Sequence, residues 1–276
     1  MIVLTEGEKV NIMSKLTVGL LASACMGMLS AQEVKLSMES PADFTQPKRI
    51  VQAEDAFSVK GRGAFFSVKS VAIDPARKYQ ISGEFRMKSG KQVLLYFGFA
   101  PYDGKNRPVL PKLVNGNSKT LTEVAEAAKK GDQVIKVKDA SQWNTKSKYC
   151  HIAFGAKADL SDLPNRDLLA TVPPNVRQNG EVWEVLLAKP LTGDIAAGTP
   201  VRQHSDGAAW IYSAGLVKLT DQWVTRKGVI TGIAPSGIPS NKFWKGTEQV
   251  KVLILCAVGA PDSEIQFRNI KITEIK

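Results

Sequence analysis

Residues 79–87 read YQISGEFRM, in which large apolar side chains alternate with polar or small ones. Successive side chains of a β-strand point to opposite faces of its sheet, so this alternation predicts a half-buried strand. Residues 250–257 read VKVLILCA, an almost continuous apolar run that is typical of a strand inside a core. Both stretches indicate a mainly β protein.

Similar stretches recur towards both ends of the chain, separated by glycine, proline, asparagine or aspartate. They are residues 34–38, 64–71, 93–100, 210–216, 223–232 and 265–275. Several short strands at this spacing, without amphipathic helices between them, predict a β-sandwich or a barrel.

The middle of the chain has a different pattern. Residues 121–131 read LTEVAEAAKKG, which predicts a short helix ended by glycine. Further strands are expected at residues 132–138, 149–154 and 181–187. We therefore predict a jelly-roll β-sandwich made of residues 32–111 and 207–276, interrupted by a small β-rich inserted domain, residues 112–206.

The charge distribution supports this division. The formal net charge is +11, of which the middle segment carries only +2. The basic character thus belongs to the predicted outer domain. In an exported protein such a surface favours anionic glycans or envelope components over nucleic acid, or it serves as a solvated surface.

The first 31 residues have the pattern of a secretory signal peptide. Lys15 precedes an apolar run, residues 16–29, and small residues precede Gln32. The run is shorter than the ~20 residues of a membrane-spanning helix, so we predict a secreted or periplasmic protein without a transmembrane segment. Residues 22–25 also resemble a bacterial lipobox that lacks its leucine, which leaves a lipid anchor at Cys25 as an alternative.

Catalytic and metal-binding groups are scarce. The cysteines Cys150 and Cys256 stand in apolar runs and are expected to be two separate buried thiols rather than a disulfide. We expect His151 to be a hydrogen-bonded structural residue in a strand and His204 to lie in a turn. These four residues lack the close ligand pairing of a structural zinc site.

No familiar catalytic motif occurs either. The sequence contains no Gly-x-Ser-x-Gly elbow, phosphate-binding loop or His-Glu-x-x-His motif. Glu181 and Glu184 are three residues apart on a predicted strand, so they should face opposite sides rather than form a glycosidase pair.

Three stretches resemble a known kind of domain. Residues 78–86 (KYQISGEFR), 221–232 (DQWVTRKGVITG) and 264–274 (EIQFRNIKITE) are similar to the ordered strands of galactose-binding-like jelly rolls. The same stretches also resemble strands of the carbohydrate-binding modules of bacterial glycoside hydrolases. The resemblance covers about 150 residues and implies a sandwich that binds a polysaccharide or other glycan.

Two departures from these modules concern calcium. Arg268 and Asn269 stand where the modules place acidic residues, and the opening strand lacks the Asn-Pro-Gly-Phe-Glu pattern that helps to hold a structural calcium ion. We therefore expect no cofactor, with a structural calcium ion as the alternative. Within the middle segment, residues 131–137 and 197–201 resemble the small β repeats of bacterial surface and phage-tail-like proteins.

Aromatic side chains in polar loops are the candidate binding residues. A pyranose ring stacks its C–H face on an aromatic ring while polar groups take its hydroxyls. Trp244 lies in the basic loop 240–246, and residues 102–107 (YDGKNR) place Tyr102 beside Asp103 and Arg107. Trp210, with its neighbour Tyr212, is a further candidate. Trp183 and Trp223 are expected to pack in the core.

The sequence thus predicts a secreted, non-catalytic carbohydrate-binding or surface-adhesion protein with an acidic glycan as ligand. Two alternatives stay open: a structural or assembly protein of the cell envelope that contacts envelope proteins through the insertion, and a polysaccharide-degrading enzyme with an unfamiliar motif.

Overall fold

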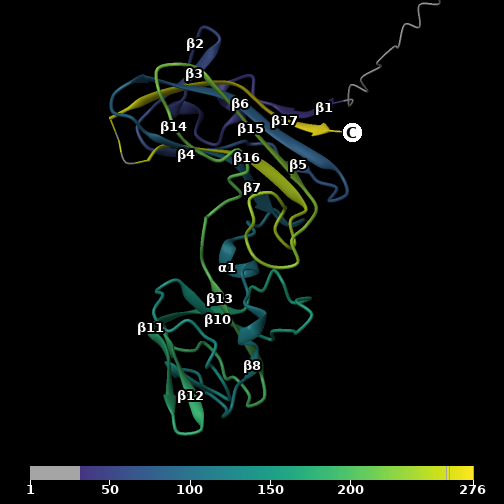
Figure 1. Ribbon diagram of the computed structural model, residues 1–276, viewed down its shortest axis with the longest axis vertical. Coiled ribbons are helices and arrows are strands. Elements are labelled where there is room, and N and C mark those ends of the chain that lie inside the picture. Colours follow the sequence, from purple (N-terminus) through teal and green to yellow (C-terminus); the bar gives the residue numbers. More distant parts are fainter. Residues whose placement is uncertain (1–31, 259, 261, 276) are drawn as a thin grey trace, which may run out of the picture. The chain divides into compact units, whose positions relative to one another are not determined.

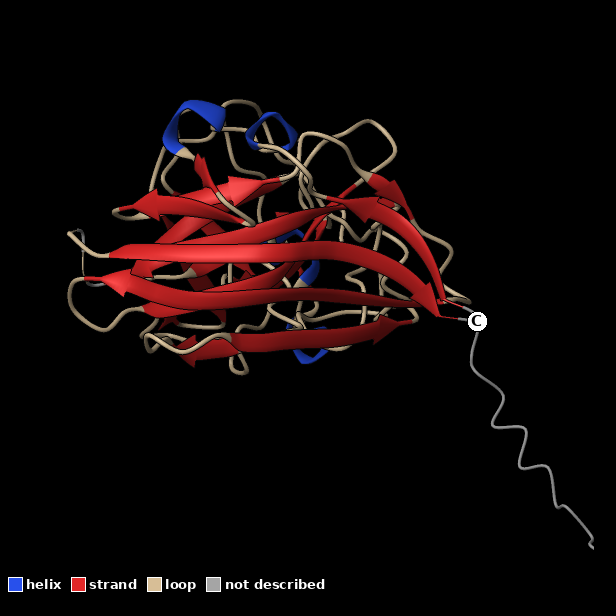
Figure 2. Cartoon of the chain, turned by 90° about the horizontal axis from the view of Figure 1, so that it is seen from above, coloured by secondary structure: helices blue, strands red, loops and turns tan. Residues whose placement is uncertain are grey.

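The computed structural model describes residues 32–258, 260 and 262–275, and most of its regular elements are β-strands (Figures 1 and 2). The predicted signal peptide and Cys25 lie outside the described residues. The strands form three sheets in which all pairs are antiparallel.

The first sheet has strands from both ends of the chain. Its order is β15 (Val224–Thr231), β6 (Lys78–Ser89), β17 (Glu264–Ile275), β3 (Ala56–Lys60) and β2 (Val51–Ala53), with β1 (Gln32–Ser37) also beside β17. The register places Phe85 opposite Phe267 and Ile81 opposite Ile272. Strands that precede the middle segment therefore pair with strands that follow it.

The second sheet is built in the same way. Its order is β14 (Leu216–Lys218), β7 (Leu94–Tyr102), β16 (Gln249–Val258) and β4 (Gly63–Phe66), and β5 (Val71–Ala72) also pairs with β16. Short 3₁₀ turns at η1 (Pro41–Asp43) and η2 (Pro47–Arg49) precede β2.

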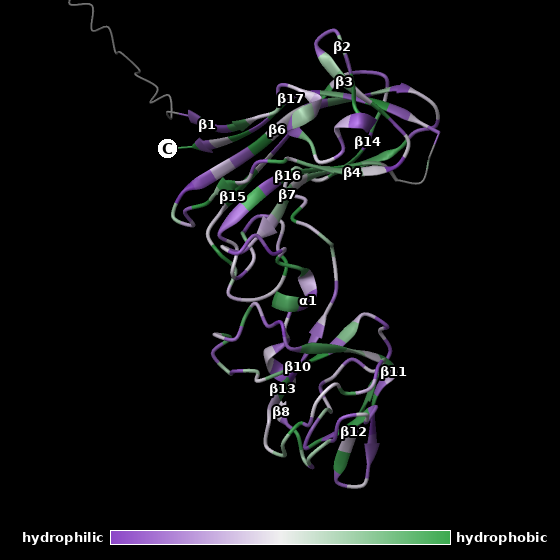
Figure 3. Ribbon diagram, turned by 180° about the vertical axis from the view of Figure 1, so that it is seen from behind, coloured by the Kyte–Doolittle hydropathy of each residue, from purple (hydrophilic) through white to green (hydrophobic). Residues whose placement is uncertain are grey.

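The two sheets share one hydrophobic core, which makes them a sandwich. Fully buried residues of β6 and β17 in one sheet belong to the same cluster as those of β7 and β16 in the other. Phe85 and Phe97 meet across the sheets, with ring centroids 4.8 Å apart in an edge-on contact. Along the strands hydrophobic and hydrophilic residues alternate (Figure 3), as expected when one face of each sheet is buried. The predicted mainly β sandwich is confirmed.

The middle segment forms the third sheet and a second hydrophobic cluster. The order is β8 (Thr122–Glu123), β13 (Pro200–Ser205), β10 (Cys150–Phe154), β11 (Leu168–Asn179), β12 (Val182–Leu187) and β9 (Val134–Val137). The second cluster includes Ile135, Trp143 and Ile152. Short helical turns precede β8 at α1 (Pro111–Val114) and η3 (Ser118–Thr120). That residues 112–206 form a separate domain stays a prediction.

The helix predicted at residues 121–131 is wrong. The segment begins with β8 and then makes backbone bridges from Val124 to Val137 and from Ala128 to Ile195. Val124 and Ala128 are buried in the second cluster. Packing of these apolar residues overrides the helix propensity of the alanines, glutamates and lysines around them.

Other details also differ from expectation. Residues 210–215 form an irregular edge segment with an isolated bridge from Ile211 to Phe99 instead of a regular strand, and strands such as β3 and β11 were not foreseen. Cys150 and Cys256 are free and buried, so the prediction of two separate thiols is confirmed.

Within the described residues, no helix has the length and apolar character needed to cross a membrane.

Candidate functional site

Five aromatic side chains gather on the outer face of the second sheet, which is the face turned away from the sandwich core. They belong to Phe66, Tyr96, Tyr102, Trp210 and Tyr212, all of intermediate exposure, and are called the aromatic face below. The strand alternation explains their orientation. Phe65, Leu95 and Phe97 are fully buried in the core, so the residues next to them point outwards.

Ring contacts join four of these residues into two pairs. The Trp210 and Phe66 rings meet edge-on with centroids 5.3 Å apart, and the Tyr96 and Tyr212 centroids lie 4.9 Å apart. Leu253 pairs with Phe66 on one side and with Gly98 on the other. It is fully buried although it is not part of the sandwich core. The outer side of Leu253, in the middle of this sheet, is therefore covered by neighbouring side chains.

The backbone around Trp210 is held by close contacts. Ile211 exchanges two hydrogen bonds with Phe99 of β7. A Cβ atom on Gly98 would lie 2.0 Å from the carbonyl oxygen of Ile211, and one on Gly228 would lie 2.3 Å from the backbone carbon of Ser213. Only glycine permits this approach at either position. Trp210 is thus carried by an edge segment that is clamped between both sheets.

An arginine fixes the same segment from the first sheet. The Arg226 side chain donates through Nε and one Nη to the carbonyl oxygen of Ala214, at 3.1 and 2.7 Å. Such a two-point contact from a planar guanidinium restricts the carbonyl in position and direction. The aromatic face therefore presents its rings on a rigid support.

Tyr102 is at one end of the aromatic face. The ammonium group of Lys251 lies 5.1 Å from its ring centroid, on the neighbouring strand β16. Burial raises the pKa of the Tyr102 hydroxyl, so it stays protonated at neutral pH and can donate a hydrogen bond. Tyr102 and Trp210 are the sequence candidates that the structure brings to one surface.

Asp103 and Arg107 stabilise the conformation of their own loop and are not part of the aromatic face. The Asp103 carboxylate is buried and accepts hydrogen bonds from the backbone N–H groups of Lys105 and Arg107 and from the Arg107 and Arg166 side chains. Burial raises the pKa of Asp103, but the bonds from Arg107 and Lys105 outweigh it and lower the pKa overall. The carboxylate is already engaged, whereas the exposed side of Arg107 remains accessible.

The prediction that Trp244 is exposed is wrong. Its ring is fully buried in the sandwich core, and its indole N–H donates to the Pro239 carbonyl at 3.1 Å. The adjacent Phe243 is also buried and contacts the Tyr79 and Phe99 rings. Two consecutive aromatic residues turn this loop inwards despite its polar neighbours. Trp244 therefore has no free ring for a sugar.

Trp223 and Trp183 were both predicted to pack in the core, and this prediction is confirmed for Trp183 alone. Trp223 is partly exposed, and the guanidinium carbons of Arg86 and Arg268 lie 4.7 and 4.3 Å from its ring centroid. The prediction of a buried Trp223 is wrong. Trp183 packs against the second cluster, as predicted.

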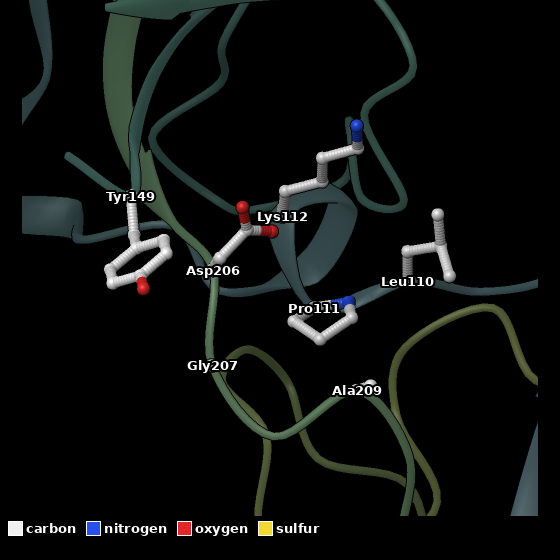
Figure 4. A pocket seen from close by; sticks show the side chains of 7 residues that line it. All are labelled: Leu110, Pro111, Lys112, Tyr149, Asp206, Gly207 and Ala209. Carbon is white, nitrogen blue, oxygen red and sulfur yellow. The ribbon is translucent and has the colours of Figure 1, made fainter. Parts of the chain in front are cut away.

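A pocket of about 490 Å³ is lined in part by residues that directly precede the edge segment of Trp210 in the chain (Figure 4). Leu110, Pro111, Lys112, Tyr149, Asp206, Gly207 and Ala209 line it. Ala209 directly precedes Trp210. A Tyr/Lys pair in one cleft would favour a polysaccharide-cleaving enzyme, but Figure 4 shows the Lys112 ammonium group pointing away from Tyr149. The pair does not converge on a common point.

The other candidate catalytic groups do not converge on one site. Glu184 accepts hydrogen bonds from Arg177 and Asn179, while Glu181 is exposed in the preceding turn. His151 lies buried in β10, as predicted, but its Nδ1 atom lacks the expected hydrogen bond to any of the described residues. Among the described residues, no three His, Cys, Asp or Glu side chains are grouped to hold a metal ion.

His204 belongs to a buried polar cluster, not to a turn as predicted. It lies in β13, where Nδ1 is 2.7 Å from the Lys112 carbonyl oxygen and Nε2 accepts from Arg202 Nε at 3.2 Å. The carbonyl requires a proton on Nδ1, so the ring is the neutral Nδ1–H tautomer. Arg202 also pairs with Asp162 at 2.6 Å, with both side chains almost completely buried.

The cluster predicts how stability depends on pH. Burial, together with the charge of Arg202, lowers the pKa of His204 from 6.5 to about 4. Between these pKa values the unfolded chain binds more protons than the folded one, so stability falls as the pH decreases from about 6.5 to 4. The expected loss is on the order of 2–3 kcal/mol.

Urea unfolding between pH 7.5 and 4.5 measures this effect. His204→Gln should flatten the pH dependence, and His151, whose pKa burial also lowers, should account for a residual slope. A stability that stays constant or rises as the pH falls through this window would contradict a buried neutral His204.

Comparisons with known proteins do not assign the chain to a family. No family model matches the sequence, and no curated protein sequence matches it. A solved structure described as "CBM4 structure and function" aligns with 90% of this chain and 97% of its own, at 8% sequence identity and a TM-score of 0.28. This TM-score is too low to support an argument. The resemblance to galactose-binding-like jelly rolls stays a prediction.

Proposed function

We propose that the protein is a secreted, non-catalytic carbohydrate-binding protein whose ligand lies across the aromatic face. The observation that carries the proposal is the gathering of partly exposed rings on one sheet face, with Trp210 held by an edge segment that contacts both sheets. Rigid aromatic surfaces bind the C–H faces of sugars at little entropic cost.

The size of the aromatic face favours a glycan chain over a single sugar. Along β7, Tyr96 and Tyr102 of this face are six residues apart, which corresponds to about 20 Å of strand. Polar groups border the rings, since Gln249 and Lys251 on β16 alternate with core residues and point to the same side. These groups can accept or donate hydrogen bonds to hydroxyls at the ring edges.

The electrostatic balance favours an acidic glycan. The net charge of +11 lies mainly in the segments that form the sandwich, and Lys251 stands beside Tyr102 on the proposed surface. Attraction of this kind raises the rate of encounter with a polyanion and is screened by salt.

The proposal of a non-catalytic role has its own support. Tyr149 and Lys112 diverge in their pocket, and Glu184 is engaged by Arg177 and Asn179. Neither arrangement provides the facing acid and base that glycoside cleavage needs.

A panel of soluble polysaccharides tests the function. Affinity electrophoresis of the mature chain should show retardation by at least one polysaccharide, with no release of reducing ends or unsaturated products. Retardation by none of the neutral and acidic polymers, together with a stable oligomer in solution, would replace the proposal with the envelope-assembly alternative. Product release would replace it with the enzyme alternative.

A further inference from the structure

A polar pocket lies on the outer face of the first sheet, on strands other than those that carry the aromatic face. Its volume is about 490 Å³, and its wall includes Gln80, Ser82, Lys227, Asn269 and Lys271. Nothing in the proposed carbohydrate site uses these residues. They come from β6, β15 and β17, which are neighbours in the sheet.

The register aligns three of them in one row. Ser82 is directly opposite Lys227 of β15 on one side and directly opposite Lys271 of β17 on the other. Residues opposite each other in neighbouring strands share a face, and strands are about 4.8 Å apart, so the two lysines start about 10 Å apart with the serine between them. Both lysine side chains are exposed, while Ser82 is 5% exposed at the bottom.

Two buried hydroxyl groups on this face have no hydrogen-bond partner. They are Ser82 Oγ and Thr273 Oγ1, which are two of the four such side-chain atoms among the described residues. Thr273 follows Lys271 on the same face of β17 and is opposite Gln80 of the pocket wall. Because an unpaired buried hydroxyl is unfavourable, these atoms indicate that a polar group from outside the chain completes the site.

The charge around the pocket has a positive surplus. Among the described residues, neither Lys227 nor Lys271 has an ion-pair partner. The carboxylate in the wall, Glu84, is engaged by Arg268 and Asn269, and the bond from Arg268 lowers its pKa. Glu84 is therefore neutralised by its own partners, and two cationic groups remain for a ligand.

We propose that this pocket binds a sulfate or phosphate ester group of an acidic glycan. Donors approach from three directions: Lys227 and Lys271 from the two sides and the Ser82 hydroxyl from below. A tetrahedral ester group offers three terminal oxygens that diverge towards such donors, whereas a carboxylate offers two in one plane. The inference that the ester group belongs to a glycan rests on the proposed function. The inference that the pocket binds a sulfate or phosphate group does not depend on it.

Binding of dextran sulfate tests the site, with unmodified dextran and polygalacturonate as neutral and carboxylate probes. We expect dextran sulfate to bind, inorganic sulfate to compete with it, and polygalacturonate to bind more weakly. Polygalacturonate that binds as tightly at equal charge density would overturn the preference for a tetrahedral group. Vesicles containing phosphatidylglycerol probe a lipid carrier, and binding to them that depends on the two lysines would overturn the glycan assignment.

Charge-matched variants separate a local site from general electrostatics. Lys227→Gln/Lys271→Gln should weaken dextran sulfate binding about tenfold or more, since two charge-assisted contacts are lost. Lys48→Gln/Lys91→Gln removes the same charge from exposed lysines outside the pocket and should change binding less than about twofold. Equal losses in the two double variants would overturn the proposal.

Ser82→Ala provides a readout that a purely structural serine would not give. Because the hydroxyl has no partner among the residues that the structure describes, its removal should leave the melting temperature unchanged or raise it, while dextran sulfate binding weakens several-fold. A lower melting temperature with unchanged binding would contradict the site. If Trp210→Ala abolishes binding of neutral polysaccharide but not of dextran sulfate, the two surfaces act separately, and either proposal can fail alone.

Discussion

Replacing Trp210 by alanine is expected to weaken polysaccharide binding by roughly 30-fold or more, the effect of removing an aromatic residue worth about 2 kcal/mol at the centre of an interface. Trp210 has the largest ring on the aromatic face and contacts the ring of Phe66, which is opposite the buried Leu253 in the sheet. Titration calorimetry with a polysaccharide identified in the panel measures the change.

The matched control is Trp223→Ala, which removes the same ring from the first sheet, where two arginines cover it. Trp223→Ala should leave the affinity within about twofold of the parent value, because surfaces remote from an interface contribute little to its energy. Trp210→Phe should retain part of the affinity, since a smaller stacking surface remains. An unchanged affinity in Trp210→Ala would remove the aromatic face as the binding surface.

Replacing Asp162 by alanine is expected to lower the free energy of unfolding by about 3–5 kcal/mol, the usual cost of leaving one partner of a buried ion pair without the other. Asp162 accepts bonds from the Lys157 backbone N–H, Asn165 and Arg202. Its loss leaves the Arg202 guanidinium buried without a counter-charge, and Arg202 in turn holds His204.

Asp159→Ala is the control, because Asp159 is exposed, lies three residues away and accepts a hydrogen bond from the backbone N–H of nearby Ser161. It should cost no more than about 0.5 kcal/mol, as expected for a surface substitution. Urea unfolding gives both values. An Asp162 variant as stable as the Asp159 variant would show that the buried pair contributes no net stability.

The sequence predicted the parts of the fold that depend on local pattern. The alternation in residues 79–87 and the apolar run in 250–257 lie in β6 and β16, each in the interior of its sheet. Period-two patterning is a direct consequence of pleated geometry, so it can be read without a partner strand. The helix prediction for residues 121–131 was wrong for the opposite reason. The conformation of this segment depends on partners that are far away in the sequence, such as Ile195.

The candidate site was only partly predictable. Tyr102 and Trp210 were identified from polar surroundings, and the same reasoning misplaced Trp244, because polarity of a loop does not reveal which rings it turns inwards. Gly98 and Gly228 were the overlooked signals, since a glycine inside a strand pattern often marks the close approach of another backbone. Phe66 and Tyr96 required the register of the sheet.

The polar pocket could not be predicted from local pattern at all. Ser82 lies more than a hundred residues before Lys227, and Lys271 follows Lys227 by a further 44 residues, so only the register of the sheet brings the three into one row. In the sequence, each of these residues reads as an ordinary polar position on the exposed face of a strand.

The indole N–H resonances of the five tryptophans test the binding surface most directly. In a ¹H–¹⁵N spectrum titrated with a bound oligosaccharide, the Trp210 signal should shift progressively. The signals of Trp143 and Trp244, whose N–H groups are bonded to backbone carbonyls inside the protein, should stay in place, as should that of Trp223. Shifts confined to Trp223 or Trp183, with Trp210 unmoved at saturation, would contradict a carbohydrate site on the outer face of the second sheet.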